Sequence, residues 1–250
     1  DKGPLPDPGG STGHASNFLM PVEHSKEMTE LSYDSIEQYK EAGVFTRSGG
    51  LEVARSEEQM EENKRRVQSA KAYGATAEVI DAEEVKEMVP YINEDIIKGA
   101  MYSEDAGVCD SLQFGEICRE RAKDMGALEV SPNTEVTDIF TEGETVTGIE
   151  TDRGDVEVED TLIIAAGLWS PKLAEMAGTR IPLKPAVHQM ISVGPIKQFE
   201  ERGVEGIEDP IVRDMDHREY ERQHGSEIEV GSYSHRPMLW DIEDVPSIDE

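Results

Sequence analysis

The stretch Thr161-Leu162-Ile163-Ile164-Ala165-Ala166-Gly167 decides the fold that we expect from the sequence. An apolar run that ends in small residues is typical of a strand buried on both faces in a parallel sheet. A helix is predicted directly after it, from about Ser170 to Met176, with Pro171 in its first turn. This order places backbone N–H donors and a positive dipole end beside a ligand. The residues alone fit an ordinary strand–helix turn packed on the core equally well.

Short alternating segments come before and after this stretch. Those before it are parted by Gly-containing turns and predict an antiparallel meander, and those after it predict a second, mainly antiparallel sheet. The meander segments are Leu128–Val130, Glu135–Phe140, Thr145–Thr151 and Val156–Val158; the later segments are Val187–Val193, Ile211–Arg213 and Ile228–Tyr233. Helical spacing and caps predict helices over Ser25–Glu41, Glu57–Tyr73, Ala82–Met88 and Ser111–Met125. The fold class is therefore α/β, with an α+β mixture of elements.

Near the N-terminus, the loop Gly9-Gly10-Ser11-Thr12-Gly13-His14-Ala15 combines small residues with one imidazole. Glycines let the backbone approach a ligand closely, and a neutral histidine supplies a nucleophilic nitrogen. The alternative is a solvated turn that carries an exposed histidine.

The composition restricts the classes of partner. Among the 250 residues, 54 are acidic and 24 are basic, which gives a formal net charge of -30. Nucleic acids and anionic membrane surfaces would be repelled, so we expect neither as a partner. The acids are spread along the chain and suit a halophilic surface, because salt screens their repulsion.

Cys109 and Cys118 are the only cysteines, and they show no metal-binding spacing, so we expect a reduced, cytoplasmic compartment and no metal. No run approaches the ~20 apolar residues that cross a bilayer. The chain opens at a polar turn without Met and closes with the acidic stretch Asp241–Glu250, from which we expect further residues on both sides.

Several separated motifs, taken in order, are similar to the FAD-dependent amine oxidoreductases of the D-amino-acid-oxidase superfamily. The resemblance is to the dimethylglycine/sarcosine dehydrogenase and oxidase branch, and it spans nearly the whole chain. The motifs are Asp1–Pro4, Gly9–Ala15, Asn133–Val136, Ile164–Pro171, Pro185–Gln189, Tyr220–Gly225 and Val230–Tyr233.

The resemblance implies FAD as the cofactor and assigns residues to it. It implies that Asp1 accepts hydrogen bonds from the adenosine ribose, with Lys2 beside it, and that the backbone of Val136 clasps the adenine. Ser11, Thr12 and His14 would lie near the flavin, and His14 matches the histidine that carries the flavin covalently in this branch. The turn residues Ala166, Gly167 and Trp169 would lie against the cofactor.

The same resemblance implies that His188 and Tyr220 form the catalytic pair that faces the substrate amine. Hydride passes from a neutral amine to flavin N5, so the protein mainly orients the C–H bond and excludes water. The alternative for His188 is a hydrogen-bonded histidine of the sheet, and for Tyr220 a packing role. The remaining histidines, His24, His217, His224 and His235, we interpret as surface or loop residues.

The family division implies a discontinuous FAD-binding domain over 1–47 and 109–181, with a Rossmann-like parallel sheet, and an interleaved substrate domain over 48–108 and 182–250. The glycine-rich GxGxxG unit that opens this fold does not occur in the chain, and neither does the family's closing segment. We therefore expect the chain to be the middle part of an enzyme.

The leading hypothesis is oxidation of the C–N bond of dimethylglycine or sarcosine, with oxygen or an electron-transfer flavoprotein as electron acceptor. A second is another amine or amino-acid oxidase of the superfamily. A third, from a different class, is a truncated fragment without catalysis.

Overall fold

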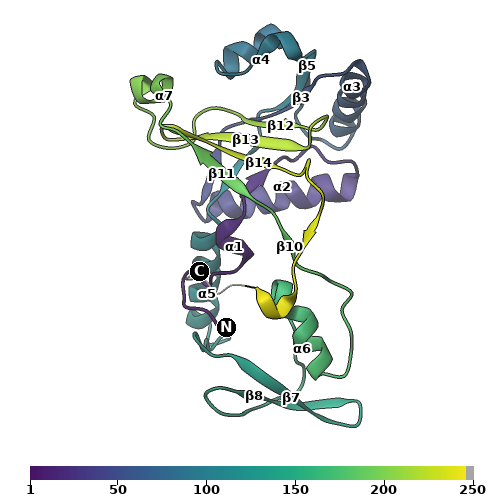
Figure 1. Cartoon of the computed structure of the whole chain (residues 1–250), viewed down its shortest axis with the longest axis vertical. Coiled ribbons are helices and arrows are strands. Elements are labelled where there is room, and N and C mark those ends of the chain that lie inside the picture. The colour runs from purple at the N-terminus through teal and green to yellow at the C-terminus, as the bar shows by residue number, and fades with distance from the viewer. Residues whose placement is uncertain (246–250) are drawn as a thin grey trace. The chain divides into compact units, whose positions relative to one another are not determined.

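The computed structural model describes residues 1–245, and the chain divides into two compact units (Figure 1). Unit 1 contains residues 1–15, 111–187 and those from 237 onward, and unit 2 contains residues 16–110 and 188–236. Each unit is therefore assembled from separated stretches of the sequence.

A seven-stranded mixed sheet forms the centre of unit 2, in the order β11-β14-β13-β12-β3-β5-β4. Its neighbours are antiparallel except for the parallel pair of β12 and β3, so the predicted mainly antiparallel sheet is confirmed. The sequence pattern does not predict β13. The strands are β3 (Gly50–Ala54), β4 (Glu78–Ile80), β5 (Gly99–Ser103), β11 (Met190–Val193), β12 (Ile211–Asp214), β13 (Glu219–His224) and β14 (Glu227–Ser232).

Helices cover both faces of this sheet, because alternate side chains of a strand point to opposite sides. On one face Val53 and Val212 pack with Val85 of α4 (Ala82–Met88). On the other face Met101 packs with Val67 of α3 (Glu57–Ala72). Unit 2 also contains α2 (Lys26–Glu41), η1 (Glu94–Ile96), α7 (Lys197–Arg202) and a small sheet of β1 (Phe18–Leu19), β2 (Phe45–Arg47) and β6 (Gly107–Cys109). The predicted helices of this unit are confirmed.

A buried ion pair lies between the sheet and α3. Glu52 is fully buried, and its Oε1 contacts Nη1 of Arg66, which is also buried. Asn63 donates from Nδ2 to the Glu52 carbonyl at 2.8 Å, and Arg66 Nη2 donates to the Val22 carbonyl at 2.6 Å. Since buried charges are tolerated only when they are paired and hydrogen-bonded, this network fixes α3 against the sheet.

Unit 1 contains the predicted meander, in which β7 (Val136–Glu142), β8 (Thr145–Thr151) and β9 (Val156–Glu157) form an antiparallel sheet. The predicted first strand, Leu128–Val130, has no strand structure. The other elements are α1 (Ser11–His14), α5 (Ser111–Asp124), η2 (Gly167–Trp169), α6 (Ser170–Met176), the pair β10 (Ala186–Val187) and β15 (Met238–Leu239), and η3 (Ile242–Asp244). Part of the predicted irregular stretch 241–250, residues 246–250, lies outside the described residues.

The prediction of a buried strand over Thr161–Gly167 is wrong. Residues 161–166 belong to no strand, and Ile163 is 80% exposed. A strand of a parallel sheet needs hydrogen-bonding neighbours, and the described part of unit 1 supplies none to this stretch. The helix predicted to follow it is confirmed as α6, with Pro171 in its first turn.

Candidate functional site

His188 and Tyr220, the predicted catalytic pair, lie together in unit 2. Strand β13 carries Tyr220, and His188 lies just before β11. The distance from His188 Nε2 to Tyr220 Oη is 3.0 Å, a hydrogen bond between side chains 32 residues apart in the sequence. The structure therefore brings these two predicted site residues into direct contact.

Strand β14 and the loop after it supply the neighbours of this pair. Gly231 lies directly opposite Tyr220 in the register, and a Cβ at this position would lie 2.2 Å from Tyr220 Cζ. The ring of Tyr233 stacks on His188, with centroids 3.9 Å apart and planes 7° from parallel. The centroid of the His235 ring lies 6.3 Å from that of the His188 ring. The imidazole of His188 is thus held by a hydrogen bond at its edge and a ring on its face.

The electrostatics of the pair favour a neutral imidazole and a protonated phenol. His188 is exposed, and its partial desolvation, with the nearby His235 second, lowers its pKa below the ordinary value. Burial, and secondarily Tyr233, raises the pKa of Tyr220. In the neutral tautomer that carries its proton on Nδ1, His188 accepts a hydrogen bond from the Tyr220 hydroxyl at Nε2.

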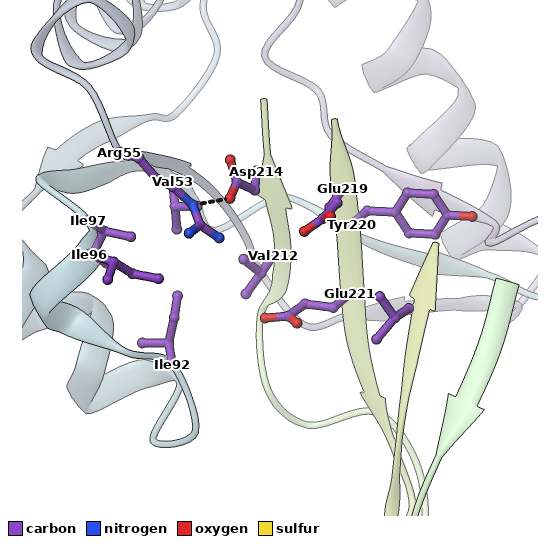
Figure 2. Close-up of a pocket in the computed structure, with 11 residues that line it drawn as sticks. Val53, Arg55, Ile92, Ile96, Ile97, Val212, Asp214, Glu219, Tyr220 and Glu221 are labelled. Carbon is purple, nitrogen blue, oxygen red and sulfur yellow. Dashed lines mark hydrogen bonds and ion pairs between the residues drawn. The ribbon is translucent and has the colours of Figure 1, made fainter. Parts of the chain in front are cut away.

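The other face of the sheet carries a small pocket. Figure 2 shows the side chain of Tyr220 pointing away from that of Glu221, as successive residues of a strand do. The pocket has a volume of about 70 Å³ and a mainly apolar lining that includes Ile92, Ile96 and Val212. Burial, and then Glu219 and Asp214, raises the pKa of Glu221. This volume holds a few water molecules and is too small for a flavin.

The predicted flavin-loop residues Ser11, Thr12 and His14 form α1 in unit 1, and all three are exposed. Ser111 Oγ, at the start of α5, donates to the Thr12 carbonyl at 2.8 Å. Within the described residues, the His14 imidazole makes no hydrogen bond or ion pair, so its nitrogens are available to a ligand.

The other predicted cofactor residues are partly brought together in unit 1. The Lys2 ammonium lies 4.1 Å from the centroid of the Trp169 ring, a cation–π contact. The Asp1 carbonyl accepts from Thr134 N at 2.8 Å, two residues before Val136. Ala166 comes immediately before η2, which contains Gly167 and Trp169. Within the described part of unit 1, no hydrogen bond, ion pair or ring contact joins α1 to this group.

Sequence reasoning does not identify three of the residues around the pair. Gly231 and Tyr233 belong to the motif Val230–Tyr233, from which no role is predicted for them, and His235 is predicted to be a surface or loop residue. His235 is indeed exposed, yet it lies beside His188. Gly231 and Tyr233 could have been grouped from their spacing, because residues two apart in an extended chain lie on one face. Residues 1–245 contain no His, Cys, Asp or Glu cluster suited to a metal and no helix long and apolar enough to span a membrane.

The model of the family "FAD dependent oxidoreductase" (DAO) matches residues 1–249. The chain belongs to this family. Its members are FAD-dependent, so the predicted family, fold class and cofactor are confirmed.

Three curated relatives and one solved structure show what this DAO-family chain is similar to. Human mitochondrial sarcosine dehydrogenase is 30% identical over 252 residues, covering 93% of this chain and 26% of the relative. The 4-methylaminobutanoate oxidase (formaldehyde-forming) of Paenarthrobacter nicotinovorans is 27% identical, covering 95% and 29%. Mitochondrial dimethylglycine dehydrogenase of Rattus norvegicus is 25% identical, covering 92% and 27%. The chain thus spans about a quarter of the length of these relatives.

Among solved structures, L-proline dehydrogenase from P. horikoshii superposes with a TM-score of 0.79 at 24% identity, covering 93% of this chain and 62% of that one. At this identity the likeness concerns the fold.

Proposed function

We propose that the protein oxidises the C–N bond of a small N-methylated amino acid of the dimethylglycine or sarcosine type. The names of all three relatives given above contain an N-methylated amino acid. The observation that carries the proposal is the hydrogen-bonded pair of His188 and Tyr220, with a 3.0 Å contact.

The pair can orient and deprotonate a substrate amine through hydrogen bonds alone, without forming a covalent bond to it. A phenol and an imidazole offer one acceptor and one donor direction to an amine, and can favour its deprotonated form. The stacked ring of Tyr233 restricts rotation of His188, so the pair presents a fixed direction to the substrate. Removal of hydride from an N-methyl group leaves an iminium, which water converts to formaldehyde and the demethylated amine.

FAD, when bound, would supply the electron-accepting chemistry and pass the electrons to oxygen or a carrier flavoprotein. We propose that unit 1 holds the FAD and unit 2 the substrate. The residues proposed to hold FAD are Asp1, Lys2, Ser11, Thr12, His14, Val136, Ala166, Gly167 and Trp169. Their arrangement fits this group, because His14 is exposed with free nitrogens and Trp169 offers a flat ring beside the Lys2 cation.

A substrate panel tests the proposed function. The FAD-loaded protein is expected to reduce an artificial electron acceptor with dimethylglycine or sarcosine and to release one formaldehyde per turnover. L-Proline and glycine, which have no N-methyl group, are the comparison substrates. Faster turnover of either comparison substrate, or acceptor reduction without formaldehyde, would contradict N-demethylation.

We also propose that His14 carries the flavin covalently, since its imidazole is exposed and unpartnered. After acid precipitation and a denaturing gel, flavin fluorescence is expected to stay with the wild-type band and to disappear in His14→Ala. His24→Ala, in the other unit, is the control and should keep the fluorescence. Flavin released by acid from the wild type would show that binding is non-covalent.

A further inference from the structure

Unit 1 contains a pocket that is larger than the one on the sheet of unit 2. Its volume is about 500 Å³, a size that accepts a small organic molecule. None of the residues proposed to hold FAD lines this pocket. Its walls are mainly apolar, and they include Ile181, Leu183, Trp240 and the rings of Pro171, Pro182 and Pro185.

The antiparallel pair of β10 and β15 brings the two main walls together. Residues 180–185 come before β10 and residues 240–242 follow β15, so both segments leave the pair at the same end. The backbone N–H of Trp240 extends the pairing by donating to the Pro185 carbonyl at 3.0 Å. Helix α6 supplies the third wall through Pro171 and Glu175.

The walls are fixed by the protein itself. The prolines of the segment before β10 restrict its backbone to extended and turn conformations. Leu183 N donates to the Ile181 carbonyl at 2.9 Å, which makes a γ-turn with Pro182 at its centre. Trp240 Nε1 donates to the Asp244 carbonyl at 2.7 Å, which holds the indole ring. A preformed pocket of this kind loses little conformational entropy when a ligand binds.

Two cations of the pocket lack a protein partner. Arg180 and Lys184 are exposed, and within the described residues neither side chain forms an ion pair or a hydrogen bond. Residues 176–199 contain no Asp or Glu, although 54 of the 250 residues of the chain are acidic. The local sequence therefore leaves these two positive charges uncompensated.

Two carboxylates also line the pocket, and neither is paired with these cations. Asp241 Oδ1 accepts from Glu243 N at 3.2 Å and caps η3. Glu175 is exposed on α6, and its side chain forms no ion pair or hydrogen bond within the described residues. An anionic ligand is therefore attracted by Arg180 and Lys184 and opposed by Glu175.

We propose that this pocket binds a small molecule in which an anionic group is attached to a flat apolar body. Arg180 and Lys184 bind the anionic group through charge-assisted hydrogen bonds, and Trp240 with the proline rings covers the body. Burial of the body supplies most of the affinity, and the two cations select for negative charge. The ligand is neither the proposed substrate nor FAD, so the inference goes beyond the proposed function.

The test compares two probes that share one aromatic ring system and carry opposite charges. 1-Naphthalenesulfonate is an anion, and 1-naphthylmethylammonium is a cation. In calorimetric titrations of the FAD-loaded protein, one naphthalenesulfonate is expected to bind per chain. The ammonium probe should bind at least about 10-fold more weakly, because the cations repel it.

Three variants assign this binding to the pocket. Arg180→Gln and Lys184→Gln are each expected to weaken naphthalenesulfonate binding by about 5- to 10-fold, between the ranges for exposed ion pairs and for charged hydrogen bonds. Glu175→Gln removes the opposing charge and should strengthen binding by about 2- to 5-fold. A merely structural role of these side chains would not produce effects of opposite sign. If one variant does not fold, the other two still give this comparison with the wild type.

The control is Arg153→Gln, which removes a positive charge from an exposed residue of the same unit outside the pocket. It should leave the affinity for naphthalenesulfonate unchanged. Equal affinities for the two probes would show an apolar surface without charge selectivity and would overturn the inference. It would also be overturned if naphthalenesulfonate did not bind, bound only in the absence of FAD, or bound the pocket variants as tightly as the wild type.

Discussion

Tyr220→Phe is expected to lower kcat/KM for dimethylglycine by about 100- to 10,000-fold, the range for loss of a group that handles a proton. The substitution removes the hydroxyl that lies 3.0 Å from His188 Nε2 and leaves the ring in place. Stability and FAD content should change little, because the packing surface of the ring is retained. Steady-state kinetics with dimethylglycine, together with thermal unfolding, checks both parts.

Tyr233→Phe is the matched control for this prediction. It removes a hydroxyl from the ring stacked on His188, and within the described residues that hydroxyl makes no hydrogen bond, so kcat/KM should stay close to the wild-type value. Equal kinetics for the two variants would show that the hydrogen-bonded phenol has no special role.

The pH profile gives a second readout for the same pair. Partial desolvation and His235 lower the pKa of His188, so the imidazole stays neutral to a lower pH than usual. If neutral His188 is required, protonation of His188 should add an acid limb to wild-type kcat/KM below the ordinary histidine pKa of ~6.5, separate from the limb due to protonation of the free substrate amine. An acid limb above that value would indicate a different titrating group.

The sequence predicts those features that depend on local patterns. Caps and helical spacing place α2, α3, α4 and α5, and the resemblance selects His188 and Tyr220, which the structure joins at 3.0 Å. Side-chain contacts that depend on strand register are not predicted. Gly231 meets Tyr220 only because β13 and β14 pair in one register, which a local pattern does not specify.

The incorrect prediction of a strand over Thr161–Gly167 also arises because a local pattern does not specify the pairing between strands. Its apolar pattern records a preference for burial, whereas a strand also requires neighbouring strands that bond to its backbone. In the described chain Ile163 lies 80% exposed without such a neighbour.

Gly231→Ala is expected to abolish most of the activity without touching a group that handles protons. The added Cβ would lie 2.2 Å from Cζ and 2.3 Å from Oη of Tyr220, closer than real Cβ contacts allow. Because the ring is rigid, it must move away, and the hydrogen bond to His188 then breaks. Misplacement by about 1 Å can cost a factor of about 100 in rate, and overpacking costs about 1–3 kcal/mol of stability.

Two comparisons show that the loss comes from the displaced ring. Gly206→Ala, in the same unit, adds a methyl group where no atom lies within 4 Å and should leave kcat/KM unchanged. In a Tyr220→Ala background there is no ring to displace, so adding Gly231→Ala should have little further effect on kcat/KM. Such non-additivity is expected only for residues that act through one contact. Independent, multiplicative losses in the double variant would show that Gly231 acts elsewhere than on Tyr220.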